Sequence, residues 1–185
     1  MQVNINVVNA IEIPAEITFI GKTNITGSLG VDPEPKAFKA GNQPDIAPLI
    51  CYESVFPGFV AGFTRKGAKI LVVITNDGWW RNTDGYKQHM YYACLRAIEN
   101  RREVLRSANT GISCRIDKLG RIQEHTEWWE PVVLSVKVNP FNNITFFARH
   151  GDYIGRFGSF IGLFFLLGMF VKTRTKKVKS SGERI

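Results

Sequence analysis

The apolar run KILVVITND, residues 69–77, constrains the fold of this chain more than any other stretch. Its core, Ile70 to Ile74, has no polar residue, which predicts a strand covered on both faces of a sheet. A second short apolar run, IAPLICY at 46–52, predicts another strand. Between them, VFPGFVAGFTRKGA has helical spacing and ends near Gly67. Strands interleaved with helices in this way indicate an α/β sheet.

The next part of the chain predicts one helix followed by antiparallel strands. Residues 86–108 place apolar side chains at roughly helical intervals, namely Met90, Ala93, Cys94, Ala97, Val104 and Leu105. GISCRID at 111–117 and IQEH at 122–125 flank the turn KLGR and predict a hairpin, and VVLSVKV at 132–138 alternates like a half-buried strand. Residues 24–45 are rich in Gly, Pro, Asn and Asp, which predicts a long exposed loop with a short strand around Lys36 to Phe38.

The end of the chain has the composition of a membrane anchor. FGSFIGLFFLLGMFV, residues 157–171, carries no charge, and Tyr153 to Gly155 extend it with Arg156 as the one cation. A bilayer core of about 30 Å needs roughly 20 such residues, and a long basic side chain at the end can reach the interface. We therefore expect a transmembrane helix at 153–171, with a buried core helix as the alternative.

Charge is concentrated after this apolar segment. The formal net charge is +8, but residues 172–185 contain the cations Lys172, Arg174, Lys176, Lys177, Lys179 and Arg184 against Glu183 alone. Basic residues beside a span favour the cytoplasmic side, which places residues 1–150 outside, and the excess needs no nucleic-acid partner. The N-terminus lacks the basic region and continuous apolar core of a cleavable signal peptide. The sequence thus predicts one of two situations. Either something upstream delivers residues 1–150 across the membrane, or the orientation is the opposite one.

Three cysteines at irregular spacing indicate free thiols, since no CxxC pair supports a disulfide framework or a zinc site. No metal or organic cofactor is expected. Cys94 and Cys114 fit buried positions in a helix and a strand. Cys51 follows an apolar strand, where open α/β sheets present functional groups, and a helix start beyond it would favour a thiolate. It is a candidate nucleophile, against the alternative of a small core residue.

Four motifs, in the same order along the chain, resemble those of a known protein family. They are ICYESVFP from Ile50, ITNDGWW from Ile74, QHMYYACLRAIENRREVLRSANTGIS from Gln88, and GDYIGRFGSF from Gly151 with the apolar helix that follows. From about Gly27 to its end, the chain resembles the C-terminal part of bacterial apolipoprotein N-acyltransferases, a membrane-anchored branch of the nitrilase (carbon-nitrogen hydrolase) superfamily.

The resemblance implies a four-layer αββα sandwich with a Glu-Lys-Cys triad at the bacterial inner membrane. Such enzymes move an acyl chain from a phospholipid to a cysteine thioester, and then to the diacylglyceryl-cysteine of a lipoprotein. Cys51 matches the nucleophile, Tyr52 and Glu53 match residues that shape the site, and Trp79 matches an aromatic of the family. The domains implied are a C-terminal portion of a nitrilase-like domain at 1–150, the span at 153–171 and a cytoplasmic tail at 172–185.

Individual roles leave alternatives open. The backbone N–H of Tyr52 is a candidate oxyanion donor. Glu53 is either a hydrogen-bond acceptor that holds a loop or a lysine, or a solvated carboxylate. Trp79 and Trp80 form either a wall for acyl chains or an interface anchor. We expect structural ion pairs from Arg96, Glu99 and Arg106, and a hydrogen-bonded helix position for His89.

The chain departs from the family before Gly27. IEIPAEITFIGKTN matches neither the glutamate nor the lysine motif, and Glu12, Glu16 and Lys22 are the candidates by order alone. A thiol without its base stays mostly protonated near neutral pH, so a chain that looks truncated in this way is expected to be inactive alone. Two other functions remain open: a soluble nitrilase-type amidase, and a non-catalytic, membrane-tethered remnant that packs against or binds lipoproteins.

Overall fold

The computed structural model describes residues 3–9, 34–39 and 44–182. Glu12, Glu16, Lys22 and most of the expected loop at 24–45 lie outside these ranges. The chain divides into two units, Met1–Gly151 and Asp152–Ile185, which we describe separately.

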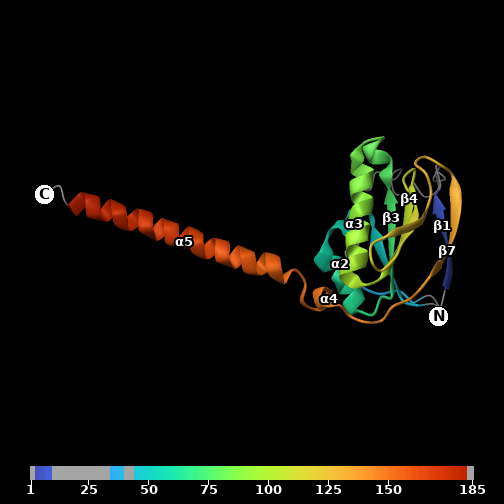
Figure 1. The fold of residues 1–185 in the computed structure, drawn as a ribbon, viewed down its shortest axis with the longest axis horizontal. Helices are drawn as coiled ribbons and strands as arrows, with labels where there is room; N and C mark the ends of the chain where they lie inside the picture. The colour runs from blue at the N-terminus through green and yellow to red at the C-terminus, as the bar shows by residue number, and fades with distance from the viewer. Residues whose placement is uncertain (1–2, 10–33, 40–43, 183–185) are drawn as a thin grey trace, which may run out of the picture. The chain divides into compact units, whose positions relative to one another are not determined.

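The first unit is built on a five-stranded sheet with the order β2-β3-β4-β5-β6, of which Figure 1 labels β3 and β4. The first three strands are parallel and the last two form an antiparallel hairpin on β4. The strands are β2 (Ile46–Ile50), β3 (Ile70–Asn76), β4 (Glu103–Asn109), β5 (Cys114–Ile116) and β6 (Ile122–His125). Parallel neighbours need crossover connections, which two helices supply.

These two crossover helices, α2 (Pro57–Arg65) and α3 (Asp84–Asn100), cover one face of the sheet. Val60 and Phe63 of α2, with Met90 and Ala93 of α3, form one core with the strand residues Ala47, Leu49, Leu71, Val73 and Val104. The side chains of β2, β3 and β4 in this core are fully buried, as the apolar runs in the sequence predict.

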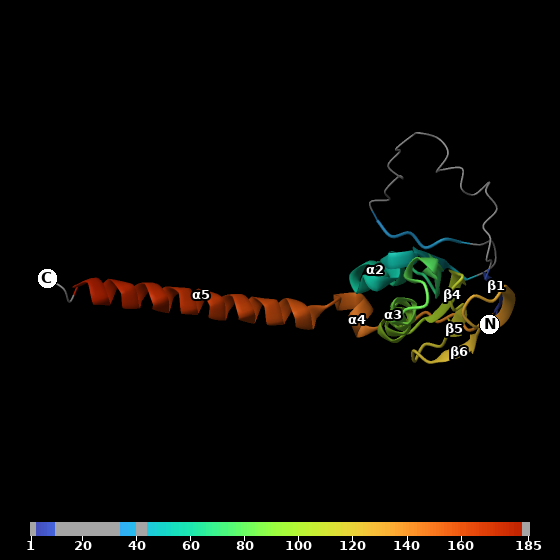
Figure 2. The same ribbon diagram turned by 90° about the horizontal axis from the view of Figure 1, so that it is seen from above.

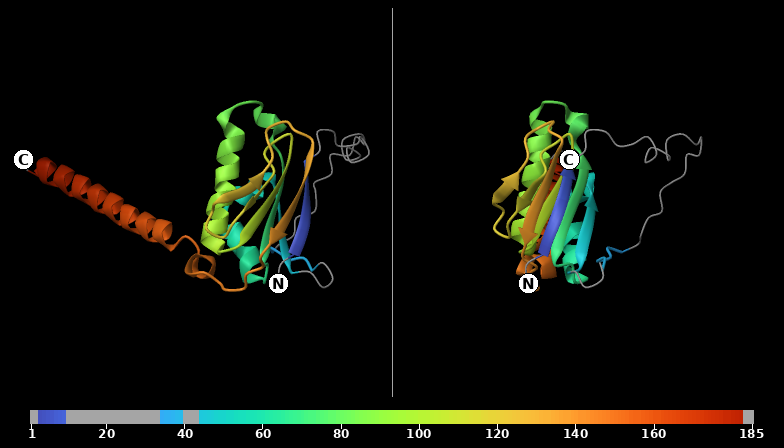
Figure 3. Two further views of the ribbon diagram at one scale, coloured as in Figure 1. Left: turned by 45° about the vertical axis from the view of Figure 1, so that its right-hand side comes forward. Right: turned by 90° about the vertical axis from the view of Figure 1, so that its right-hand side faces the viewer.

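The opposite face carries a second, smaller sheet of β1 (Val3–Asn9) and β7 (Val132–Val138), which pair antiparallel. Ile70 and Leu105 pack there against Val136 and Val138. The described part of this unit therefore has three layers: helices, a five-stranded sheet and a two-stranded sheet, which are visible in Figures 2 and 3. A mixed α/β fold was the prediction, and the structure confirms it.

One sequence prediction was wrong at its C-terminal end. The helix expected over 86–108 ends at Asn100, and Val104 and Leu105 lie in β4. Arg101 adopts a left-handed conformation with φ of 50°, which ends the helix. Pairing with β3 then places Val104 and Leu105 on opposite faces of the sheet, so both are buried as strand residues.

Three shorter segments also differ from expectation or extend it. The segment after β3 begins with a 3₁₀ helix, η2 (Asp77–Trp80). Around Lys36 the structure has an isolated bridge between Phe38 and Ile46 in place of a strand. A short helix, α4 (Phe146–His150), closes the first unit, and Arg65 donates a 2.7 Å hydrogen bond to its Ala148 carbonyl.

The second unit is one helix, α5 (Tyr153–Gly182). Its part from Tyr153 to Lys172 is long and apolar enough to cross a membrane by length and composition. The helix continues beyond Val171, the last residue of the expected span, into the basic residues of the chain end.

Candidate active site

Cys51 lies where β2 ends, at the first position of a 3₁₀ helix, η1 (Cys51–Val55). Its φ of 49° is in the left-handed region, which residues with a Cβ rarely adopt because the Cβ approaches the following carbonyl. Strained backbone of this kind persists only where neighbouring groups hold it, and it is common at functional sites. The turn leaves Cys51 half-buried at the carboxyl edge of the parallel strands, as the sequence predicted.

Buried partners hold the backbone on both sides of this turn. Ser54 Oγ donates a 2.7 Å hydrogen bond to the Cys51 carbonyl, and His89 Nε2 lies 3.2 Å from the same oxygen. Just before the turn, the Ile50 N–H donates to the Glu53 carboxylate at 2.7 Å. Glu53 therefore accepts a hydrogen bond that helps to hold the turn at Cys51.

The thiol faces β3. Thr75 Oγ1 lies 3.3 Å from Cys51 Sγ and can donate a hydrogen bond to it. The parallel register explains this contact. Ile50 pairs with Ile74, and the residues that follow them, Cys51 and Thr75, are therefore neighbours. A hydroxyl donor at this distance stabilises a thiolate, which is the nucleophilic form of cysteine.

The two other cysteines are structurally different. Cys94 in α3 and Cys114 in β5 are buried. Burial raises the pKa of Cys94, and it raises the pKa of Cys114 to about 12, because a charged thiolate is poorly solvated in the interior. Both thiols therefore remain protonated and act as small core residues, whereas Cys51 is accessible.

A buried ion pair lies under the site. Asp77 at the start of η2 and Arg106 in β4 are both fully buried, and Arg106 Nη2 donates to Asp77 Oδ2 at 2.5 Å. His89 of α3 joins them, with Nδ1 3.4 Å from Arg106 Nη2 and 3.5 Å from Asp77 Oδ1. Since His89 Nε2 faces the Cys51 carbonyl, one continuous network links the ion pair to the backbone of Cys51.

Two aromatic side chains of the site contact the His89 ring, and one of them, Tyr52, is also 55% exposed. Tyr52 stacks on the His89 ring with centroids 5.7 Å apart, and Trp80 lies 5.2 Å from His89 and 6.1 Å from Tyr52. Trp79, in contrast, is 82% exposed. The structure thus brings Cys51, Tyr52 and Glu53 together with Trp80, while Trp79 extends into solvent at the same edge.

Sequence reasoning placed Arg106 in a structural ion pair and His89 among hydrogen-bonded helix residues, and both have these roles. It did not identify Asp77 as the partner of Arg106, nor Thr75 and Ser54 as partners of Cys51. The Asn-Asp pair directly after a buried strand was the available signal for Asp77. Within the described ranges, no group of three His, Cys, Asp or Glu side chains has the geometry to hold a metal ion.

The sequence profile of the carbon-nitrogen hydrolase family matches residues 22–142. This chain belongs to the carbon-nitrogen hydrolase family. Similar curated sequences show which carbon-nitrogen hydrolases it resembles. It is 44% identical over 114 residues to the apolipoprotein N-acyltransferase of Chlorobaculum tepidum, covering 62% of this chain and 21% of that protein. It is 34% identical over 116 residues to the apolipoprotein N-acyltransferase of Thermotoga maritima, covering 63% and 23%.

A longer match, 36% identical over 141 residues, is to the apolipoprotein N-acyltransferase of Bradyrhizobium diazoefficiens and covers 76% of this chain and 26% of that protein. This carbon-nitrogen hydrolase chain thus spans about a fifth to a quarter of the length of these curated relatives. The resemblance seen in the sequence motifs is confirmed.

Solved structures support the same fold. A carbon-nitrogen hydrolase from Helicobacter pylori G27 superposes with a TM-score of 0.54 at 13% identity, over 60% of this chain and 45% of that chain. An amidase from Nesterenkonia sp. gives 0.53 at 17% identity, over 70% and 49%. The present chain corresponds to about half of each of these carbon-nitrogen hydrolase folds.

Proposed function

We propose that this chain provides the nucleophile of an apolipoprotein N-acyltransferase. Cys51 takes a fatty acyl group from a phospholipid as a thioester and transfers it to the α-amino group of a lipoprotein's diacylglyceryl-cysteine. The observation that carries this proposal is Cys51 itself, an accessible thiol on a strained turn, in a chain 34–44% identical to proteins of that name.

The chemistry proceeds in two balanced steps. The Cys51 thiolate attacks the ester carbonyl, the C–O bond breaks, and the lysophospholipid alkoxide leaves with a proton from the general acid. The lipoprotein amine then attacks the thioester, the C–S bond breaks to release the thiolate, and a base takes the amine proton as the amide forms. In both steps the oxyanion needs a fixed donor, and the backbone N–H of Tyr52, directly after the nucleophile, is suitably positioned in the chain.

Among the described residues, no carboxylate or lysine has a hydrogen bond with the thiol. Within the described part of the chain, Cys51 Sγ has a hydrogen bond with Thr75, and Glu53 is engaged by the Ile50 N–H. We propose that the glutamate and lysine of the triad, and the remaining layer of the αββα sandwich, come from polypeptide outside these 185 residues. The isolated chain is accordingly expected to be inactive in acyl transfer.

The apolar part of α5 supports a membrane location for this chemistry. We propose that Tyr153–Lys172 spans the bacterial inner membrane, with residues 1–150 in the periplasm and the basic chain end in the cytoplasm. Every described side chain from Tyr153 to Val171 is exposed, which suits contact with lipid. Retention of the chain in the membrane pellet after alkaline carbonate extraction tests this part of the proposal, and release into the supernatant contradicts it.

A chimera tests the catalytic proposal. Residues 27–172 replace the corresponding segment of a full-length N-acyltransferase, and the product is expressed in cells depleted of their own enzyme. We expect N-acylated lipoprotein N-termini by mass spectrometry, no N-acylation with Cys51→Ser, and retained N-acylation with Cys94→Ala as the matched cysteine control. A membrane-inserted, folded chimera that is inactive, or one that is equally active with Cys51→Ser, contradicts the proposal.

A further inference from the structure

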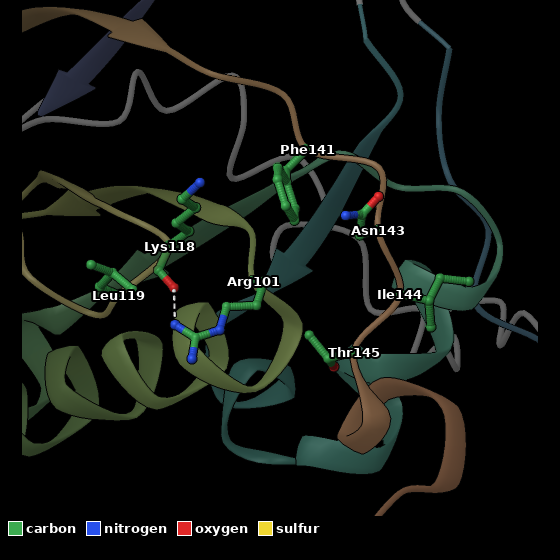
Figure 4. Close-up of a pocket in the computed structure, with 7 residues that line it drawn as sticks. All are labelled: Arg101, Lys118, Leu119, Phe141, Asn143, Ile144 and Thr145. Carbon is green, nitrogen blue, oxygen red and sulfur yellow. Dashed lines mark hydrogen bonds between the residues drawn. The ribbon is translucent and has the colours of Figure 1, made fainter.

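A groove of about 430 Å³ lies at the edge of the five-stranded sheet opposite to Cys51. Cys51 follows the carboxyl end of β2, whereas Arg101 in the groove directly precedes the amino end of β4, where Glu103 pairs with Ile70. The groove is therefore separate from the candidate active site. Figure 4 shows its two walls, one around Lys118 and Arg101 and the other along residues 141–145.

Both walls are fixed by hydrogen bonds. Arg101 Nη1 donates to the Lys118 carbonyl at 3.3 Å (Figure 4). On the opposite wall, the Asn143 carbonyl accepts a 2.8 Å bond from the buried Arg102, and Thr145 Oγ1 donates to the Glu99 carbonyl at 2.5 Å. The concave shape is thus part of the folded domain.

The groove combines cations with apolar side chains. Lys118 Nζ lies 4.6 Å from the centroid of the Phe141 ring, a cation–π contact that leaves its other donors available. Leu119 and Ile144 are 47% and 41% exposed beside it. Among the described residues, no ion pair involves Lys118 or Arg101, and the nearby Asp117 carboxylate is bound by Arg121 at 2.8 Å. The two positive charges are therefore not neutralised by a neighbouring acid.

The chain connects this groove closely to the apolar helix. Ile144 and Thr145 lead directly into α4, which ends at His150, and α5 begins at Tyr153. Phe146, the first residue of α4, is 63% exposed. Basic side chains with apolar neighbours, a few residues before a candidate spanning helix in the sequence, suit the head group of an anionic lipid.

We propose that this groove binds the head group of an anionic phospholipid. The phosphate faces Arg101 and Lys118, and the glycerol and first acyl carbons contact Leu119, Phe141 and Ile144. The inference rests on the proposed membrane span of α5 and is independent of catalysis by Cys51.

The test uses the full chain in nanodiscs that contain a photoactivatable phosphatidylglycerol, or the same probe as phosphatidylcholine. After irradiation, mass spectrometry locates the labelled peptides. We expect peptides with Lys118 or residues 141–145 to be labelled several-fold more by phosphatidylglycerol than by phosphatidylcholine. Lys118→Glu should lower this labelling at least about fivefold, the effect of one basic residue at an anionic surface.

Lys87→Glu is the matched control, since Lys87 is an exposed lysine in the first turn of α3, at the end remote from Arg101. It makes the same charge change and should leave groove labelling unchanged. Equal labelling by the two lipids, or equal effects of Lys118→Glu and Lys87→Glu, overturns the proposal. The labelling experiment needs no acyl transfer. Lipid binding by the groove can therefore be confirmed even if the N-acyltransferase chimera is inactive, and it can be excluded even if the chimera is active.

Discussion

At the scale of single residues, Thr75 Oγ1 lies within hydrogen-bond distance of the Cys51 sulfur atom. Thr75→Val keeps the shape of the side chain and removes its O–H donor. Because the thiolate is the reactive form, we expect alkylation of Cys51 by iodoacetamide at neutral pH to slow several-fold. Thr75→Ser restores the donor and should restore the rate. An unchanged rate with Thr75→Val, measured by peptide mass spectrometry, would show that the hydroxyl does not stabilise the thiolate.

The buried pair of Asp77 and Arg106 makes a second prediction at this scale. Asp77→Ala leaves the Arg106 charge in the interior without its partner, which typically costs about 3–5 kcal/mol. We expect a large loss of hydrogen-exchange protection in β3 and β4. The double variant Asp77→Leu with Arg106→Met removes both charges and should recover much of that protection. Equal protection in the single variant and the wild type is the contradictory result.

At the scale of elements, the β5–β6 hairpin depends on Asp117. Its carboxylate accepts from the backbone N–H groups of Leu119 and Arg121 and from the Arg121 side chain. Partial burial alone would raise the pKa of Asp117, but these hydrogen bonds outweigh it and hold the pKa below its usual value. A lowered acid pKa stabilises the folded state above the unfolded-state pKa, and this contribution is lost as the pH falls through the lowered value.

We therefore expect hydrogen-exchange protection of β5 and β6, corrected for intrinsic exchange, to decrease between pH 6 and pH 3. Asp117→Asn cannot bind Arg121 as an ion, so its protection should be lower at pH 6 and less dependent on pH. The Glu124 carboxylate, whose pKa is lowered by its hydrogen bond with Arg115, retains part of the dependence in this variant. Identical pH profiles for the two proteins would exclude Asp117 as the cause.

Also at this scale, the sequence predicted β2, α2, β3 and the hairpin because their apolar patterns are short and bounded by turn residues. It extended the helix of α3 into β4 because Val104 and Leu105 also fit a helical period. The local sequence pattern does not indicate that Arg101 adopts the left-handed conformation that ends the helix.

The site was predictable only in part for a related reason. Cys51 and its neighbours in the CYE motif could be identified from the sequence. Thr75, Asp77, His89 and Arg106 come from separate elements and meet only through the sheet register and the packing of α3. Such contacts have no constant spacing in a single sequence.

At the scale of the whole molecule, the described layers leave apolar surface next to Cys51. Ile50 and Ile74, paired at the ends of β2 and β3, are 55% and 47% exposed on the face opposite to the helices. The superposed solved chains are about twice as long as their matched parts. Both observations agree with our proposal that further polypeptide completes the sandwich and brings the acid-base residues to Cys51.

The central claim is that Cys51 carries the acyl group, and trapping that group tests it most directly. The chimera described above is incubated with glycerophospholipid in the absence of a lipoprotein acceptor, and its peptides are analysed by mass spectrometry. We predict one fatty acyl adduct on the peptide that contains Cys51, removable by neutral hydroxylamine as a thioester and absent from Cys51→Ser. An adduct on another residue, or lipoprotein acylation that continues with Cys51→Ser, would contradict the account.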